Sequence, residues 1–308
     1  MSFLVEMARG AYPKDALNGF STNPQFGPDN ARVMMWLSQL AYETAHESKI
    51  ESILDDWLLK MRAFVSNDPV TGLPPHSACV VIAGGRDATF VSFSGTDPLK
   101  IEDWITDFTP ARSATDLHSG FQNAVETVWP TIKTAIENRP ADEQFVFFTG
   151  HSLGGALAII AAERAMRELN VQARAVYTYG SPRTGGAAFF DAYEPKLGNT
   201  TYRLVQGTDI VATVPPTADF RHVGQSRNCP TDGRFDDAQT QIDAGEANKP
   251  DFAEAVLQSG LADFRALAAF RFIRGIGPRP LDRLGALLPR MVRDHVPANY
   301  FRALSVAL

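Results

Sequence analysis

The chain has few cysteines, which excludes two classes of small-domain architecture. Only Cys79 and Cys229 occur among its 308 residues. Cys79 lies in an expected buried strand and Cys229 in a polar loop, so a single disulfide between them stays open. A disulfide framework or a zinc motif would need more cysteines at characteristic spacings. The sequence therefore excludes both.

Long hydrophobic runs and an excess of positive charge are also missing. No stretch has the length and continuous apolar character of a membrane span, so we expect no transmembrane segment. The formal net charge is −6 and the pI about 5.5, which argues against nucleic acid as a partner. The first residues carry neither a basic lead nor an apolar stretch of signal-peptide length. We therefore expect either a cytoplasmic location or export without a conventional leader.

The chain has enough hydrophobic residues, 44% of the total, to form a large globular core. Alternation and apolar runs predict strands at residues 78–83, 89–93, 145–149, 175–179 and 202–205. Helices are predicted from Asn30 as a cap to Leu40, and over 50–61, 120–138, 156–164 and 187–193. Residues 217–250 have little regular pattern, and 251–293 are helical with breaks. Strands that alternate with helices predict a mostly parallel sheet covered on both faces.

The most informative stretch is a serine between a strand and a helix. An apolar run over 145–149 leads into Gly150-His151-Ser152-Leu153-Gly154, and a small-residue helical stretch follows. In this G-x-S-x-G pattern a tight turn holds the serine side chain above the sheet edge. The flanking glycines are needed because side chains there would collide with the strand or the helix. We therefore predict that Ser152 is a nucleophile; the alternative is an ordinary glycine-rich turn.

A serine nucleophile needs a histidine base, and elimination finds one. In hydrolases with this turn the chain order is serine, acid, histidine. Of the six histidines, three precede the serine and His151 adjoins it, with its side chain expected to point away from the hydroxyl. His222 and His295 remain. We favour His295, which follows a proline-broken helix, and expect a structural or pocket-lining role for His222.

The acid should stand just beyond the carboxyl end of a later strand, where open α/β sheets place their sites. Asp209 meets this condition because it follows the strand predicted at 202–205. Its alternative role is to cap a turn. Asp191 and Asp219 are weaker candidates, since neither closes a strand.

Several motifs together resemble the fungal-type, or class 3, lipases. They are Gly150-His151-Ser152-Leu153-Gly154-Gly155, Tyr179-Gly180-Ser181-Pro182-Arg183, the strand ending at Asp209 before Pro215-Pro216, and Asp294-His295 with Tyr300. The similarity covers roughly residues 30–225 and 290–302. It implies an α/β-hydrolase fold, a mostly parallel central sheet with helices on both faces, as a single domain over 1–308. It also implies the triad Ser152, Asp209 and His295. The stretch at about 228–292 lies outside the similarity, and its own pattern predicts a helical insertion before the histidine.

The resemblance extends to an oxyanion hole and a lid. One donor is expected from the backbone N–H of Leu153, directly after the nucleophile. Phe93-Ser94-Gly95-Thr96 resembles the family's F-R-G-[S/T], which implies Thr96 as the second donor; Ser94 replaces the usual arginine, and a plain β-turn is the alternative. Residues 97–110 form an amphipathic segment that matches the position of the family's lid. Its apolar face comprises Ile101, Trp104, Ile105 and Phe108.

These features predict a serine ester hydrolase, a lipase of the triacylglycerol type, that works through an acyl-enzyme on Ser152. Its substrate would be an acylglycerol or another apolar ester, met in transient contact with a lipid–water interface. The mechanism implies no metal and no organic cofactor. An esterase for soluble or aromatic esters, a phospholipase, a fixed surface helix in place of the lid, and a non-catalytic binding module of the same fold remain as alternatives.

Overall fold

The computed structural model describes residues 6–66, 78–95, 111–215, 219–235, 241–243 and 290–306. Its centre is an eight-stranded sheet in which the spatial order of the strands equals their order in the chain. The strands are β1 (Lys60–Val65), β2 (Val80–Gly85), β3 (Ala88–Phe93), β4 (Phe145–His151), β5 (Ala175–Tyr179), β6 (Thr201–Gln206), β7 (Gln225–Cys229) and β8 (Gln241–Asp243). The strands from β3 to β7 run parallel, and β1, β2 and β8 pair antiparallel at the edges. The mostly parallel sheet is confirmed.

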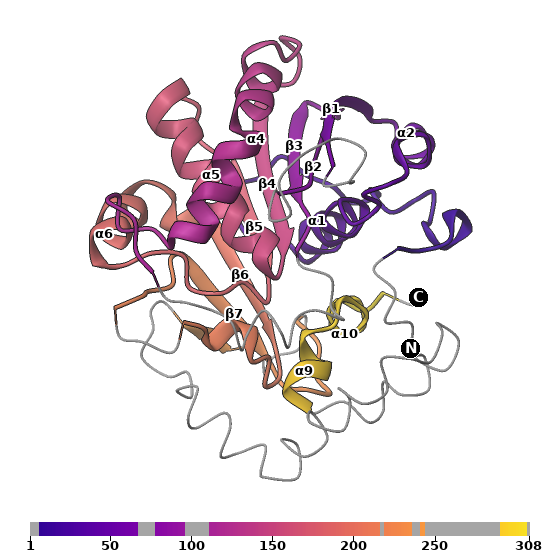
Figure 1. Cartoon of the computed structure of the whole chain (residues 1–308). Helices are drawn as coiled ribbons and strands as arrows, with labels where there is room; N and C mark the ends of the chain where they lie inside the picture. The colour runs from indigo at the N-terminus through magenta and orange to yellow at the C-terminus, as the bar shows by residue number, and fades with distance from the viewer. Residues whose placement is uncertain are drawn as a thin grey trace.

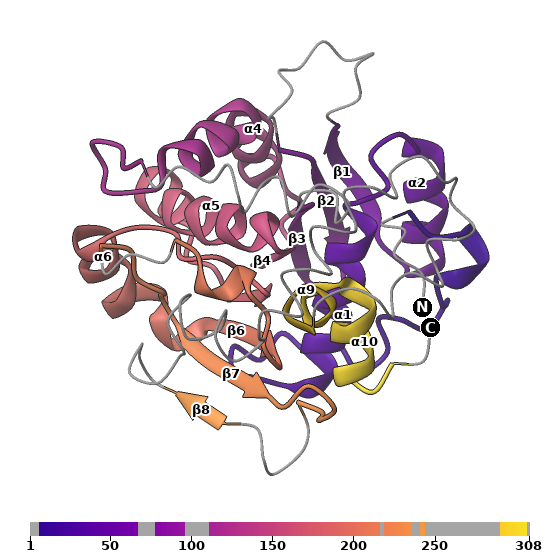
Figure 2. The ribbon, with the colours of Figure 1, turned by 60° about the horizontal axis from the view of Figure 1, so that its bottom comes forward.

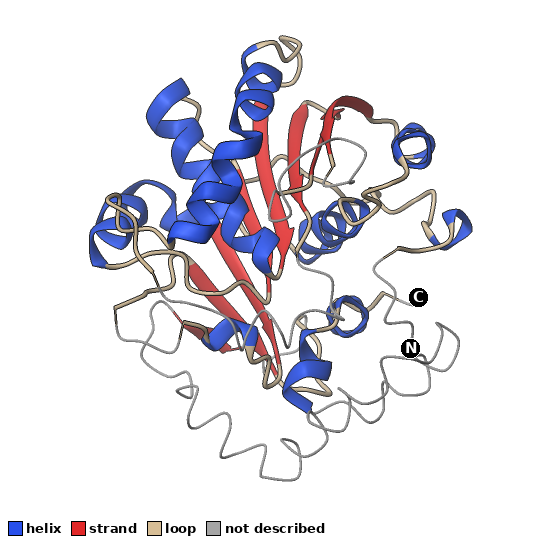
Figure 3. Cartoon of the chain, viewed as in Figure 1, coloured by secondary structure: helices blue, strands red, loops and turns tan. Residues whose placement is uncertain are grey.

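Helices cover both faces of this sheet (Figures 1 and 3). They are α1 (Pro28–Leu40), α2 (Glu47–Asp56), α4 (Ser119–Glu137), α5 (Leu153–Leu169), α6 (Ala187–Leu197), α9 (Arg290–His295) and α10 (Pro297–Ala303). Short 3-10 turns occur at Arg9–Ala11, Gly198–Thr200 and Val211–Thr213, the last of which is η5. Pro130 lies inside α4 without dividing it.

Alternate residues of the central strands feed two separate cores. In β4, Phe147 packs toward α1, α2 and α10, whereas Val146 and Phe148 pack toward α4, α5 and α6. This is the two-residue period of a strand that is buried on both faces. The ring centroids of Trp36 in α1 and Phe301 in α10 lie 4.4 Å apart, so the C-terminal helix closes the first core, and Figure 2 shows these two helices together.

Three local predictions are wrong. The second helix ends at Asp56 rather than Met61, because Leu58 takes a left-handed conformation (φ 59°) and the Leu59 N–H donates to the Leu54 carbonyl, as in a Schellman end. Asn30 does not cap α1, because the N-cap residue is Gly27. The Asn30 side chain instead forms hydrogen bonds with the backbone N–H and carbonyl of Ser21.

The third error concerns residues 217–250, where β7 and β8 add two strands to the sheet. By contrast, the strands predicted at 78–83 and 89–93 are present as β2 and β3, which pair as a hairpin with a two-residue turn at Arg86 and Asp87, both at positive φ. Residues 244–289, which make up most of the insertion predicted at 228–292, lie outside the described residues, as does all of the lid predicted at 97–110.

Candidate active site

Ser152 occupies the turn between β4 and α5 in a conformation that few non-glycine residues adopt. Its backbone has φ 59° and ψ −132°, and it forms the N-cap of α5. The Ser152 N–H donates to the Tyr179 carbonyl at 2.8 Å, and its own carbonyl accepts from Gly155 N–H at 2.9 Å. Backbone strain of this kind costs on the order of 1–3 kcal/mol and persists only where the surroundings fix it. The predicted strained serine is confirmed.

The glycines around Ser152 are required by close approach of the backbone. A Cβ at Gly150 would overlap the carbonyl of Gly154. One at Gly154 would lie 2.5 Å from the Phe93 carbonyl oxygen, and one at Gly155 would lie 2.7 Å from the Cβ of Ser181. Real Cβ atoms do not approach other atoms so closely, so the expectation of collisions is correct.

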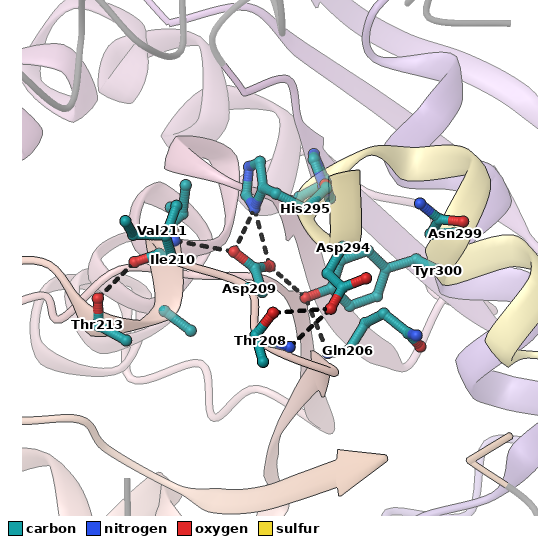
Figure 4. Close-up of polar contacts among 12 residues, drawn as sticks. Gln206, Thr208, Asp209, Ile210, Val211, Thr213, Asp294, His295, Asn299 and Tyr300 are labelled. Atoms are coloured by element: carbon teal, nitrogen blue, oxygen red, sulfur yellow. Dashed lines mark hydrogen bonds and ion pairs between the residues drawn. The ribbon is translucent and has the colours of Figure 1, made fainter. Parts of the chain in front are cut away.

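Asp209 and His295 meet although 86 positions separate them (Figure 4). Asp209 follows β6, and His295 is the last residue of α9. The Nδ1 of His295 lies 2.8 Å from each carboxylate oxygen of Asp209, and both side chains are buried. An Nδ1–H that donates to this carboxylate leaves the His295 Nε2 as a proton acceptor, which is the tautomer a general base needs.

Two more donors hold the Asp209 carboxylate. Oδ1 accepts from the Val211 N–H at 2.9 Å, and Oδ2 accepts from the Tyr300 hydroxyl at 2.6 Å. Burial raises the pKa of Tyr300 well above 10, and the adjacent Asp209 charge raises it further, so this phenol remains a donor. The family resemblance included Tyr300 but assigned it no role. Its hydrogen bond to Asp209 shows that it helps to hold the acid.

The hydroxyl of Ser152 and the second ring nitrogen of His295, Nε2, are both buried. Within the described residues, neither Ser152 Oγ nor His295 Nε2 has a hydrogen-bond partner. His295 nevertheless lies at the turn that carries Ser152, because its carbonyl oxygen is 2.8 Å from the Nε2 of His151. The structure thus joins Asp209 to His295 and brings His295 beside the serine turn, with the serine–histidine hydrogen bond not formed.

Gly180 makes room for the acid–histidine pair. Its φ is +58°, and a Cβ there would lie 2.8 Å from His295 Nδ1 and would overlap Asp209 Oδ2. Sequence reasoning placed this residue in the Tyr179–Arg183 motif but gave it no role. A glycine directly after a buried strand was the only available signal.

Asp294 ties the helix that carries His295 to the turn that carries Asp209. Its Oδ2 accepts from the Thr208 N–H at 2.8 Å, the Thr208 hydroxyl at 3.1 Å and the Thr231 hydroxyl at 2.8 Å. The side chain is buried. Adjacent residues of α9 therefore contact adjacent residues of the turn after β6 (Figure 4). Sequence reasoning missed this contact, which no local pattern encodes.

His151 is fully buried, and both ring nitrogens have partners other than the serine hydroxyl, as expected. Nδ1 lies 2.8 Å from the Tyr42 hydroxyl and Nε2 lies 2.8 Å from the His295 carbonyl oxygen. Burial lowers its pKa well below 6.5, and the neighbouring His295 lowers it further. His151 is therefore neutral at physiological pH.

The competing candidates either bond another group or are exposed. His222 Nε2 is 2.8 Å from the Ala212 carbonyl oxygen, which fits the expected structural role. Asp191 and Asp219 are both exposed.

The oxyanion residues are only partly described. Leu153 is the first residue of α5, so its N–H belongs to the helix-start amides that have no acceptor within the helix. A Cβ at Gly95 would lie 2.8 Å from the Ser152 Cβ, so the loop after β3 reaches the nucleophile. Thr96 and the predicted lid face, Ile101, Trp104, Ile105 and Phe108, lie outside the described residues.

The described ranges also give three negative findings. They contain no group of three or more His, Cys, Asp or Glu side chains arranged to hold a metal ion. Among the helices that the structure describes, none has the length and apolar character of a membrane span. Cys79 and Cys229 are both buried and are not bonded to each other.

Comparison with known proteins tests the resemblance. Residues 90–218 match the family described as "Lipase (class 3)". The chain is 36% identical over 154 residues to "Secreted mono- and diacylglycerol lipase 1" of Fusarium solani, which covers 47% of this chain and 45% of that protein. A lipase of Rhizomucor miehei is 32% identical over 163 residues, or 48% of this chain and 44% of that protein. The resemblance to the class 3 lipases is confirmed. The chain spans less than half the length of these two relatives.

Solved structures of lipases establish the fold. The Rhizomucor miehei lipase propeptide complex superposes with a TM-score of 0.57 at 22% identity, covering 72% of this chain and 73% of that one. Lipase II from Rhizopus niveus gives 0.58 at 20% identity, over 73% and 89%. A third structure, with 0.55 at 22% identity over 71% and 87%, is described as a triacylglycerol lipase whose catalytic centre is a serine protease triad. At these identities the likeness concerns the fold, and the predicted α/β-hydrolase fold is confirmed.

Proposed function

We propose that this protein is a serine-dependent carboxylic ester hydrolase, a lipase that acts on acylglycerols through an acyl-enzyme on Ser152. The observation that carries the proposal is the strained Ser152 at the β4–α5 turn beside a buried Asp209–His295 pair. The three residues have the types, chain order and environment of a serine triad. The match to class 3 lipases supports the same reaction.

In the proposed reaction, His295 Nε2 takes the proton of Ser152 as Oγ attacks the ester carbonyl. Asp209 stays ionised and orients the imidazole. The backbone N–H groups of Leu153 and Thr96 stabilise the developing oxyanion. The alcohol leaves with the proton from His295, and water activated by the same base releases the fatty acid. No step requires a metal or an organic cofactor.

The missing hydrogen bond between Ser152 and His295 is compatible with this scheme. Catalytic hydrogen bonds are often long or poorly aligned without substrate and tighten in the complex. Both unpartnered atoms are buried, and a buried polar atom without a hydrogen bond costs free energy, so a hydrogen bond formed when substrate fills the site is favourable.

For the substrate we propose an apolar ester presented at a lipid–water interface, with residues 97–110 as a lid. The names of relatives support an acylglycerol, since the Fusarium protein is called a mono- and diacylglycerol lipase and is also called secreted. Export of this chain is accordingly part of the proposal. Hydrolysis rates across the solubility limit of tributyrin test the lid: a jump when the emulsion forms supports it, whereas simple saturation favours a soluble-ester esterase.

The decisive experiment combines hydrolysis of p-nitrophenyl esters with covalent labelling by a fluorophosphonate. Ser152→Ala should abolish both, and His295→Ala should lower kcat by about 10⁴-fold or more. His222→Ala is the matched control and should retain activity. Retention of most hydrolysis by Ser152→Ala would refute the proposal. Absence of labelling in the native protein would favour a binding module instead.

A further inference from the structure

His151 connects the nucleophile to the base by a route that the proposed reaction does not use. It precedes Ser152 in the chain, and its side chain reaches across to α9. The Nε2 of His151 lies 2.8 Å from the carbonyl oxygen of His295, and the two ring centroids are 4.7 Å apart. A single hydrogen bond therefore links the residue next to the nucleophile with the backbone of the base.

The partners of His151 fix its tautomer. A carbonyl oxygen only accepts, so the Nε2 of His151 must carry the proton that it shares with His295. Nδ1 is then the acceptor, and the Tyr42 hydroxyl donates to it at 2.8 Å. The chain of donors thus runs in one direction, from Tyr42 through His151 to the backbone of His295. Each polar atom of the imidazole is satisfied, as a fully buried ring requires.

The bond acts at the C-terminal end of the helix that carries His295. α9 has six residues and ends at His295, and the last carbonyls of a helix have no acceptor role within it. The hydrogen bond from His151 occupies the carbonyl of that last residue. Asp209 sets the rotation of the His295 ring through Nδ1, whereas His151 sets the position of its backbone. Together the two contacts determine where Nε2 lies.

We infer that His151 is a positioning residue that sets the separation between Ser152 and His295, with Tyr42 holding its tautomer. This inference rests on the proposed function. A displacement of about 1 Å in a reacting group can cost about 100-fold in rate. A bridge between the residue next to the nucleophile and the backbone of the base is suited to prevent such a displacement.

The neutral state of His151 matters to the same geometry. Among the described residues, the ionisable groups that contact its ring are His295, Tyr42 and Tyr300, and the Tyr300 ring centroid is 5.5 Å away. None of these is an acid that could balance a second proton on His151. A doubly protonated ring would stand beside the imidazolium that forms on His295 during the reaction, and the two like charges would oppose each other.

Three variants test the inference: His151→Phe, His151→Gln and Tyr42→Phe. Phenylalanine keeps a planar ring but has no donor, whereas the glutamine amide nitrogen can occupy the position of Nε2 and donate to His295. We expect His151→Phe to lower kcat for a soluble p-nitrophenyl ester by about 100-fold, with KM within about twofold. We expect kcat of His151→Gln to be about tenfold higher than that of His151→Phe, and kcat of Tyr42→Phe to be only about fivefold below the native value.

The urea midpoint of every variant is measured beside the kinetics, since a role in packing alone would lower stability without splitting kcat from KM. The inference is overturned if His151→Phe folds and keeps kcat within about twofold of the native protein. It is also overturned if His151→Gln is as impaired as His151→Phe. Should His151→Phe not fold, His151→Gln and Tyr42→Phe decide: the inference requires kcat to fall about tenfold in His151→Gln and about fivefold in Tyr42→Phe with KM unchanged, and a native-like kcat in both variants overturns it. Failure of the proposed function shows separately, as activity that survives in Ser152→Ala.

Discussion

At the scale of single residues, the buried charge of Asp209 is balanced by hydrogen bonds rather than by a cation among the described residues. Its carboxylate accepts hydrogen bonds from His295, from the Tyr300 hydroxyl and from the backbone N–H of Val211. A buried carboxylate needs several donors to replace the water it has lost. Removal of one donor should therefore affect both stability and the orientation of the base.

Tyr300→Phe removes one of these donors and leaves the ring in place. We expect a loss of about 1–3 kcal/mol in the free energy of unfolding, because the hydroxyl bonds Asp209 at 2.6 Å in a buried site. kcat should fall about tenfold, because Asp209 then holds His295 less firmly. Tyr193→Phe is the matched control, since the Tyr193 hydroxyl is buried against Thr201 instead. Urea titration and ester hydrolysis should show a stability loss in both variants and a kcat loss only in Tyr300→Phe.

Gly180→Ala tests the space that the acid–histidine pair needs. The added methyl would strain a backbone at φ +58° and would lie 2.8 Å from His295 Nδ1. We expect kcat to fall by about 100-fold or more, because the pair must shift to accommodate it. Gly10→Ala serves as control, since a Cβ there meets nothing within 4 Å. Native-like kcat in folded Gly180→Ala would contradict the geometry described for the pair.

The sequence could predict some of these residues and not others. Ser152, Asp209 and His295 were found by motif, chain order and elimination, which depend on residue types and positions along the chain. Gly180 and His151 act through contacts between segments that are distant in the chain. No periodicity or spacing reports such contacts, so their roles required the structure.

At the scale of elements, α9 and the turn after β6 are joined by two adjacent pairs. Asp294 accepts from Thr208, and His295 meets Asp209. Gly207 allows this approach, because at φ +51° it carries no side chain to overlap the Asp294 carboxylate. The short α9 is thereby held in register with the strand end that supplies the acid.

Asp294→Ala should loosen this register. Three hydrogen bonds to the carboxylate are lost and the Thr208 N–H loses its acceptor, so we expect a loss of about 2–3 kcal/mol in the free energy of unfolding. kcat should fall about tenfold as His295 becomes less well placed. Asp232→Ala is the control, because Asp232 is exposed and its ion pair with Arg302 at 3.4 Å contributes at most about 1 kcal/mol. Equal stability losses in the two variants would argue against the role given to Asp294.

Element prediction succeeded where the pattern was strong. The apolar runs of β4 and β5 and the serine helix were located correctly. β7 was missed because Gln225–Cys229 lacks both apolar alternation and branched side chains. Its strand character comes from backbone pairing with β6 on one side and β8 on the other. Only tertiary context supplies that pairing.

At the scale of the whole molecule, the site lies where the carboxyl ends of four neighbouring parallel strands meet. β3 leads to Gly95, β4 to Ser152, β5 to Gly180 and β6 to Asp209. Parallel strands bring their ends to one edge of the sheet, which is why chain order alone predicted the acid. His295 comes from α9 and not from a strand end, so the sequence could propose it only by elimination.

The buried His151 should also make global stability depend on pH. Its pKa in the folded protein is well below 6.5, whereas the unfolded chain has an ordinary histidine pKa of about 6.5. Below that pH His151 binds a proton in the unfolded state but not in the folded state, so the free energy of unfolding falls as the pH falls. The contribution has a slope of at most about 1.4 kcal/mol per pH unit and vanishes above about pH 7.

Urea titrations of the native protein and His151→Gln between pH 7.5 and 5 would measure this contribution. Every other titratable group is present in both proteins. The difference between the two stability curves therefore isolates His151. We expect the native protein to lose its advantage over His151→Gln progressively below about pH 6.5. A difference that stays constant over the whole range would mean that His151 binds a proton as readily in the folded protein as in the unfolded chain, and the neutral tautomer given to the Tyr42–His151–His295 connection would then be wrong.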